Sequence, residues 1–336
     1  MLNKVGRDIP TNIPALEGRE VYQGEFAIEP KAKRAGKPVH MSRVGTNKVL
    51  ASIDEAIEKA GVKDGMTLSF HHHLRNGDYV MKMVMERVQA KGIKDITIAS
   101  SSLSPCHDFL VEMIQDGTVT ALETSGLRDR LGKFLTQNPG VLKRPVVIRS
   151  HGGRARAVCT GEAHIDVAFM GVPACDLRGN ATGRKGKSAC GALGYAMVDS
   201  HYADKTVLLT DNLIDYVYPI SIPQTDVDYI VEVEAIGDPE GIASGAVGIT
   251  KNPVQIKIAE MAAEFLDQAG IIQEGFSFQL GAGGAPLAVA KFIGEKLEKK
   301  GVVGGFGVGG ATGVLVSMLE KGHIKAIYDT GVRIPS

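Results

Sequence analysis

The chain has 336 residues, in which 38 Lys and Arg are balanced by 38 Asp and Glu. This balance argues against a protein whose main partner is a nucleic acid, because such proteins carry a basic surplus. No run approaches the roughly 18 apolar residues of a membrane span. The four cysteines contain no C-x-x-C pair, which is typical of a reduced protein. We therefore expect a cytoplasmic protein that binds neither nucleic acid nor membrane.

Residues 1–45 are rich in Pro, Gly, Lys and Arg and show weak apolar periodicity. This pattern predicts an extended N-terminal arm that packs on the body of the protein or on a neighbouring subunit. A nucleic-acid-binding tail is the alternative, but the basic run is short and the chain is neutral.

Strands and helices alternate from residue 46 onward. The apolar spacing predicts helices at 52–60, 79–90, 105–116, 253–269 and 287–299, and strands at 66–70, 95–100, 119–122, 144–148, 165–170, 205–210, 229–233, 277–280 and 324–328. This alternation indicates an α/β protein with an open, mostly parallel sheet and helices on both faces, whose ligands bind at the carboxyl ends of strands. We expect one such domain over 46–322. Residues 323–336 are expected to begin a linker or a second domain that is otherwise absent.

A glycine-rich turn at 281–285 is the sharpest local feature. Gly281, Gly283 and Gly284 stand between a predicted strand and a predicted helix, and Pro286 suits the first helical position. Free N–H groups at a helix N-terminus favour an anion or a developing oxyanion. We predict that Gly283, Gly284 and Ala285 act catalytically in this way and that Gly281 contacts substrate. The alternative is a turn needed only for packing.

A second glycine cluster imitates a dinucleotide-binding fingerprint. Gly305, Gly307 and Gly310 satisfy G-x-G-x-x-G, and Asp329 follows about twenty residues later. The preceding apolar run is only two residues long, and the motif comes near the end of the chain. We therefore do not expect nicotinamide binding.

Three consecutive histidines, residues 71–73, raise the question of a metal. Alternate side chains of a strand face opposite sides, so the three imidazoles are not expected to form a tripod, and we predict no metal site. We interpret His73, Arg75 and Asn76 instead as polar or cationic substrate contacts at the mouth of the sheet.

Two further glycine-rich loops carry cations. One holds His151 and Arg154, and the other holds Lys187 and ends near Cys190. Together with the loop after residue 70 they predict a pocket for a multiply anionic ligand. Cys190 is a weak candidate nucleophile, because nothing in the sequence identifies a base paired with it.

Taken together, these segments resemble the alpha chains of citrate lyase. The resemblance covers nearly the whole sequence and rests on residues 70–78, 150–154, 186–195, 227–231 and 280–286. It implies a CoA-transferase-like α/β fold and an exchange that converts citrate and acetyl-S-carrier protein into citryl-S-carrier protein and acetate. It implies no permanently bound cofactor, since the thioester belongs to the phosphopantetheine-type group of the carrier protein or to CoA.

The same resemblance implies partners: a citryl-carrier-protein lyase beta subunit, an acyl carrier protein gamma subunit, and further copies of the chain in a homo-oligomer. Family members normally continue into a second CoA-transferase-like half, whereas this sequence resembles the first. Many related CoA transferases also place a catalytic glutamate after the glycine turn, but residues 301–313 contain no carboxylate.

The missing glutamate favours a mechanism without a glutamyl thioester. The hypothesis is that a citrate carboxylate attacks the acetyl thioester directly while both substrates are bound. Arg75, His151 and Arg154 would hold the citrate carboxylates, because a guanidinium matches a carboxylate with two hydrogen bonds. A same-fold sugar-phosphate isomerase and a non-catalytic structural subunit remain the alternatives.

Overall fold

The computed structural model describes residues 45–243, 248–281, 283–309 and 312–328, together with residues 2, 6, 8, 10, 12, 14 and 17. The arm predicted for 1–45 therefore lies almost entirely outside the described residues. The chain divides into two compact units. Unit 1 comprises Met1–Ala189 and Leu193–Ile242, and unit 2 comprises Cys190–Ala192 and Ala243–Ser336. The sequence pattern indicates no boundary near residue 243.

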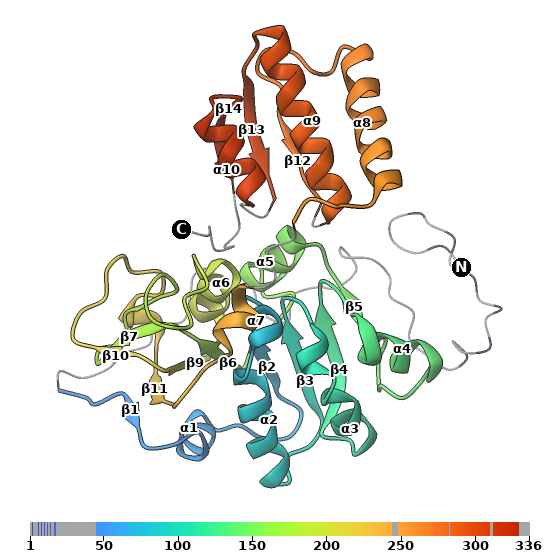
Figure 1. The fold of residues 1–336 in the computed structure, drawn as a ribbon. Helices are drawn as coiled ribbons and strands as arrows, with labels where there is room; N and C mark the ends of the chain where they lie inside the picture. The colour runs from blue at the N-terminus through green and yellow to red at the C-terminus, as the bar shows by residue number, and fades with distance from the viewer. Residues whose placement is uncertain are drawn as a thin grey trace. The chain divides into compact units, whose positions relative to one another are not determined.

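Unit 1 is built on an eight-stranded sheet whose strand order is β1-β11-β9-β6-β2-β3-β4-β5 (Figure 1). Every neighbouring pair in it is parallel, which confirms the predicted fold class. The strands are β1 (Val49–Leu50), β2 (Thr67–Phe70), β3 (Ile96–Ser100), β4 (Val119–Thr124), β5 (Val147–Ile148), β6 (Val167–Gly171), β9 (Lys205–Thr210) and β11 (Tyr229–Glu232). A small separate sheet contains β7 (Ala174–Asp176), β8 (Ala181–Thr182) and β10 (Leu213–Ile214).

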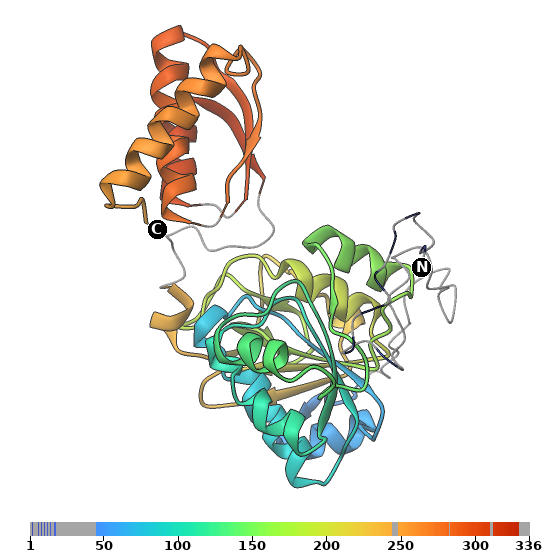
Figure 2. The ribbon, with the colours of Figure 1, turned by 90° about the vertical axis from the view of Figure 1, so that its right-hand side faces the viewer.

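Helices cover both faces of the large sheet (Figures 1 and 2). The connections that carry α1 (Ile53–Ala60), α2 (Val80–Ala90) and α3 (Leu110–Gln115) all advance in one direction across the sheet. Those that carry α5 (His151–Cys159) and α6 (Gly194–Tyr202) return in the other direction. Because such crossovers are right-handed, the two groups of helices pack on opposite faces.

Local signals explain where the helices begin and end. The Ser52 hydroxyl accepts the N–H of Glu55 at the start of α1, and Gly61 ends that helix with a φ of 70°. The Asp78 carboxylate accepts the N–H groups of Val80 and Met81 at the start of α2. Five of the described helices are not predicted from apolar periodicity: α4 (Asp129–Gln137), α5, α6, α7 (Pro239–Ala243) and α10 (Gly313–Glu320). In α5 the pair Gly152–Gly153 hides the helix, because glycine is a poor helix former.

Unit 2 holds a three-stranded parallel sheet in the order β12-β13-β14, packed against helices. Its elements are α8 (Pro253–Gln268), β12 (Phe278–Gln279), α9 (Gly284–Lys300), β13 (Gly304–Val308), α10 (Gly313–Glu320) and β14 (Ile324–Tyr328). Its core includes Leu287, Ile293, Leu297 and Leu315. β14 pairs with β13, so residues 324–328 belong to this sheet. The sequence pattern instead predicts that a linker or a second domain begins at residue 323.

The first part of the second glycine cluster, residues 304–308, forms a strand. Gly305 and Gly307 lie within β13. A Cβ at Gly305 would stand 2.6 Å from the Ser277 hydroxyl, and one at Gly307 would stand 2.7 Å from a Leu315 methyl group. Gly305 and Gly307 therefore allow close packing of β13 against its neighbours. Within the described part of the chain, no helix combines the length and apolarity needed to cross a bilayer.

Candidate active site

Five rings gather at the carboxyl edge of the unit 1 sheet, and we call them the ring cluster: His71, His72, His73, His151 and Tyr195. The three consecutive histidines follow β2, His151 opens α5, and Tyr195 lies in the first turn of α6. The His72 ring lies 5.7 Å from that of His151 and 5.5 Å from that of Tyr195. His151 and Tyr195 are 5.3 Å apart, and His73 is 4.9 Å from His71. The structure thus joins two of the predicted residues, His73 and His151, in one contiguous group.

Hydrogen bonds fix the inner part of the ring cluster. His71 Nε2 donates to the carbonyl oxygen of Gly171, at 2.9 Å. A neutral His71 then has an accepting Nδ1, which receives the Nδ1–H of His73 at 2.8 Å and its backbone N–H at 3.2 Å. His72 contacts the Ser101 hydroxyl, with its Nδ1 at 2.5 Å and its backbone N–H at 3.0 Å.

Burial keeps several of these imidazoles uncharged. It lowers the pKa of His71 and, together with neighbouring positive groups, lowers the pKa of His72 to about 3. Burial and then the positive charge of Arg154 also lower the pKa of His151, although this side chain reaches the surface. A bound anion would therefore meet neutral imidazoles at His72 and His151 and not imidazolium cations.

A buried ion pair joins the two helices that bear His151 and Tyr195 of the ring cluster. Arg154 binds Asp199 with two N–H···O contacts of 2.7 Å, and it also donates to the Ala99 carbonyl at 3.0 Å. Arg154 is 4 % exposed and Asp199 is fully buried. Burial disfavours the guanidinium charge, but the Asp199 carboxylate outweighs that effect and raises the pKa of Arg154. Because this guanidinium already holds a carboxylate, the arrangement does not support the expectation that Arg154 binds substrate.

The ion pair and the rings together align α5 with α6. His151 and Arg154 lie one turn apart on α5, and Tyr195 and Asp199 lie one turn apart on α6. His151 meets Tyr195 and Arg154 meets Asp199, so the two helices run in the same direction. Their N-termini therefore lie at the same end, beside the ring cluster. Two helix N-termini with neutral imidazole donors favour a ligand with more than one negative charge.

Arg75 and Asn76 follow the histidines after Leu74, in a single turn of 3-10 helix, Arg75–Gly77. Arg75 has a φ of 53°, a conformation rare for any residue but glycine, and it is partly exposed. The Asn76 side-chain oxygen accepts the N–H of Cys106. A Cβ on Gly77 would lie 2.4 Å from the Asp238 carbonyl oxygen, so this turn is pressed against residues 237–242. Both predicted residues thus stand at the same edge of the sheet as the ring cluster.

Lys187 has a different setting. Its ammonium group donates to the Glu234 carbonyl at 2.6 Å and lies 3.9 Å from an Asp211 oxygen. The adjacent Ser188 hydroxyl donates to the same Asp211 oxygen. Lys187 therefore joins three loops of unit 1, and no described contact links it to the ring cluster.

The predicted catalytic turn belongs to unit 2. Gly283 is the N-cap of α9, and because it has no side chain it offers no cap to the first N–H groups of the helix. The helix begins at Gly284, so Pro286 occupies its third position and not the first. A Cβ at Gly284 would stand 2.9 Å from the Thr250 nitrogen, whereas the described atoms nearest to a Cβ at Gly281 belong to the Pro286 ring, at 3.3 Å. The first N–H groups of α9 therefore have no side-chain cap.

The comparisons agree with this architecture. A family model described as "Citrate lyase, alpha subunit (CitF)" matches residues 46–332. The alpha chain from Haemophilus influenzae is 49 % identical over 84 % of this chain and 56 % of its own length. The one from Klebsiella pneumoniae is 47 % identical with the same coverage. The chain thus spans about half the length of the curated relatives it matches.

Solved structures show the same relationship. A Streptococcus mutans crystal structure described as the alpha subunit of citrate lyase in complex with citrate has a TM-score of 0.86 and 50 % identity, over 98 % of this chain and 64 % of that one. A malonate decarboxylase alpha subunit from Acinetobacter baumannii has a TM-score of 0.63 at 16 % identity, over 86 % of this chain and 52 % of that one. That second likeness concerns the fold alone. The fold is therefore the CoA-transferase-like α/β class. Within that class, the chain belongs to the citrate lyase alpha subunit family.

Sequence reasoning missed four residues of this edge: His71, His72, Tyr195 and Asp199. The sequence pattern places the histidines on a strand, where His72 would face away from His71 and His73. In the structure β2 ends at Phe70, and the histidines follow in a loop. Tyr195 and Asp199 are spaced four apart, which places both on one face of a helix. That spacing was the available signal, although the segment lacks the apolar periodicity that marks a helix.

Proposed function

We propose that this chain carries the transferase step of citrate lyase, the exchange of acetate for citrate on a thioester. The observation that carries the proposal is the ring cluster beside the paired N-termini of α5 and α6. Citrate carries three carboxylates, and this edge offers helix N-termini, imidazole donors and the nearby Arg75. Membership of the citrate lyase alpha subunit family supports the choice of substrate.

The proposed route forms a ternary complex. A citrate carboxylate oxygen attacks the acetyl thioester carbonyl and forms a tetrahedral oxyanion, which hydrogen bonds from backbone N–H groups would stabilise. The carbon–sulfur bond then breaks, which leaves a citric–acetic anhydride and a thiolate. The thiolate attacks the citryl carbonyl and releases acetate. The protein contributes mainly orientation, since both nucleophiles come from the substrates.

In this proposal Arg75, His73 and His151 hold citrate. Arg154 does not contact citrate and positions α5 through its ion pair with Asp199. The thiol belongs to the phosphopantetheine-type arm of an acyl carrier protein subunit or of CoA. A lyase beta subunit would consume the citryl thioester, and the chain would act as part of an oligomeric complex. The absence of a carboxylate in 301–313 supports a route without a glutamyl thioester.

The proposal is tested with acetyl-CoA as a small thioester donor. The chain is mixed with acetyl-CoA and isotopically labelled citrate, and citryl-CoA is sought by liquid chromatography. Label in the thioester supports the transferase. Acyl groups trapped on a protein side chain would contradict the ternary-complex route while leaving the exchange itself intact. A folded chain that binds citrate but never exchanges it would favour a non-catalytic subunit.

A further inference from the structure

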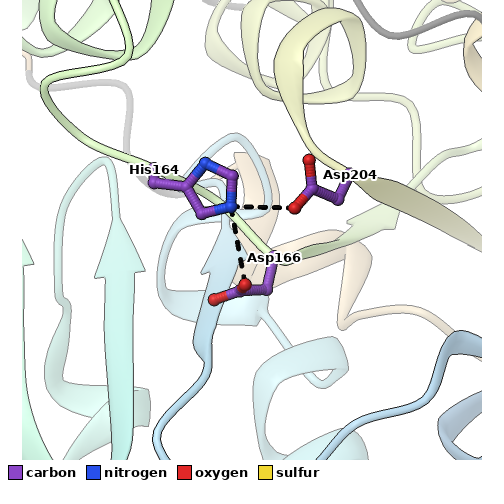
Figure 3. A group of neighbouring side chains, drawn as sticks. All are labelled: His164, Asp166 and Asp204. Atoms are coloured by element: carbon purple, nitrogen blue, oxygen red, sulfur yellow. Dashed lines mark hydrogen bonds and ion pairs between the residues drawn. The ribbon is translucent and has the colours of Figure 1, made fainter. Parts of the chain in front are cut away.

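A histidine and two aspartates meet at the opposite edge of the unit 1 sheet, where the strands begin. His164 and Asp166 precede β6, and Asp204 precedes β9 (Figure 3). The ligands of parallel sheets bind at the carboxyl ends of strands, so this edge lies away from the candidate active site. The proposed function uses none of these three side chains.

The donor atoms of the three side chains converge on one point. His164 Nε2 lies 2.8 Å from Asp204 Oδ2 and 3.5 Å from Asp166 Oδ1, as Figure 3 shows. One donor atom from each of the three residues lies within 4.8 Å of the donor atoms of the other two. Zinc ligands lie about 2.0–2.2 Å from the ion, which sets their donor atoms apart by distances similar to those between these three side chains. Small side-chain rotations would therefore bring all three donor atoms onto one ion.

The backbone that carries the three side chains is held by the sheet. Asp166 N–H donates to the Thr67 carbonyl, Asp204 N–H to the Ile165 carbonyl, and Lys205 N–H to the Asp166 carbonyl. The Asp166 side chain is oriented further, because its Oδ2 accepts the Thr67 N–H at 2.7 Å. This bond leaves Oδ1 directed at the imidazole. Hydrogen bonds of this kind fix metal ligands in the correct direction.

We propose that His164, Asp166 and Asp204 bind a divalent transition-metal ion, for which Zn²⁺ is the probe. One imidazole nitrogen with two carboxylate oxygens suits such an ion, whereas Ca²⁺ takes six to eight oxygens. The two carboxylates neutralise its charge. In the metal-free protein Nε2 is hydrogen-bonded to Asp204; on binding, Nε2 gives up its proton to solvent and coordinates the ion.

The position of the site at the amino ends of β6 and β9 indicates a structural role for the ion. It joins the amino ends of β6 and β9 directly, and it reaches β2 through the Thr67 N–H. His164 and Asp204 are about two-fifths exposed, so water completes the coordination sphere. The ion is therefore a clamp on the central strands of the sheet and has no part in the transfer reaction.

The test uses the full chain, stripped with a chelator and titrated with Zn²⁺ by calorimetry. We compare the wild-type protein with His164→Gln and Asp204→Asn. The control variant is His201→Gln, because His201 is equally exposed but lies 2.9 Å from a single carboxylate, that of Asp226. We expect wild type and the control to bind one more equivalent of Zn²⁺ than the two variants, or to bind it at least about tenfold more tightly.

A second readout is the unfolding midpoint with and without Zn²⁺. An ion that binds only the folded chain raises the midpoint of wild type and the control. The two variants, which remove exposed side chains, should fold without the ion and gain nothing from it. Equal stoichiometry, affinity and midpoint shift in all four proteins would overturn the site, as would wild-type affinity weaker than about 1 mM. Either result is independent of citrate exchange.

Discussion

Arg154 and Asp199 form a two-pronged ion pair, with both N–H···O contacts at 2.7 Å, inside unit 1. The pair links α5 to α6 one turn below the contact between His151 and Tyr195. A second anchor is the Ala99 carbonyl at the end of β3, which accepts from the same guanidinium. A buried ion pair thereby sets the position of two rings, the exposed His151 and the buried Tyr195.

Removing Asp199 should therefore be costly. Asp199→Ala leaves the Arg154 guanidinium buried without its carboxylate, and breaking such a pair costs about 3–5 kcal/mol of unfolding free energy. Urea unfolding followed by circular dichroism measures the loss. The control is Glu86→Ala, which breaks an exposed pair with Lys82 and should cost less than about 1 kcal/mol. Equal losses in the two variants would contradict the role of the buried pair.

The ring cluster should make the protein sensitive to acid. The folded pKa of His72 is about 3, against an ordinary value of 6.5. As the pH falls from about 6.5 toward 3, the unfolded chain takes up a proton that the folded chain does not, so stability is lost on acidification. One such proton contributes a slope of about 1.4 kcal/mol per pH unit. Unfolding free energies measured at several pH values should show a shallower slope for His72→Gln. Parallel curves for the two proteins would contradict this account.

Arg75 is the cation that we expect citrate to contact. Arg75→Ala should weaken citrate binding at least about tenfold, because a charge-assisted hydrogen bond is worth about 1.5–3 kcal/mol. Calorimetric titration with citrate measures the change. Arg87→Ala is the control, since Arg87 lies on the exposed side of α2 and pairs with Asp54. Unchanged citrate affinity in Arg75→Ala would remove this residue from the proposed site.

Gly284 should tolerate no side chain. A Cβ there would stand 2.9 Å from the Thr250 nitrogen and 3.1 Å from the Gly248 carbonyl oxygen. Gly284→Ala should therefore displace the first turn of α9 and destabilise it by about 1–3 kcal/mol. Gly313→Ala is the matched control, because Gly313 also opens a helix but no atom of the described residues lies within 4 Å of a Cβ placed there. Hydrogen exchange of the α9 amides distinguishes the two, and equal protection in both variants would contradict the close approach.

Much of the fold was readable from the sequence, because its strands are buried and its helices are periodic. The run Ile324–Tyr328 forms β14 with the predicted bounds, and β3 begins one residue later than the pattern indicates. The helices α5 and α6 were not readable. Their helical form depends on contacts between them, such as that of Arg154 with Asp199, and not on an apolar face of their own.

The candidate site was only partly predictable for the same reason. His73, Arg75, Asn76 and His151 lie at the expected edge of the sheet, because the carboxyl ends of parallel strands meet there. Arg154 is predicted to contact substrate, and the sequence does not reveal that a carboxylate 45 residues later pairs with its guanidinium. Long-range pairing between charged residues leaves no local trace, whereas the ends of strands do.

The most direct test of the transferase proposal is mass spectrometry of the carrier protein. The chain is mixed with citrate and acetyl-S-carrier protein, and the mass of the carrier protein is followed over time. The proposal predicts that the acetyl group is replaced by a citryl group and that acetate is released. A carrier protein that keeps its acetyl group, with the chain folded, citrate bound and the remaining half of a family-length chain supplied separately, would contradict it.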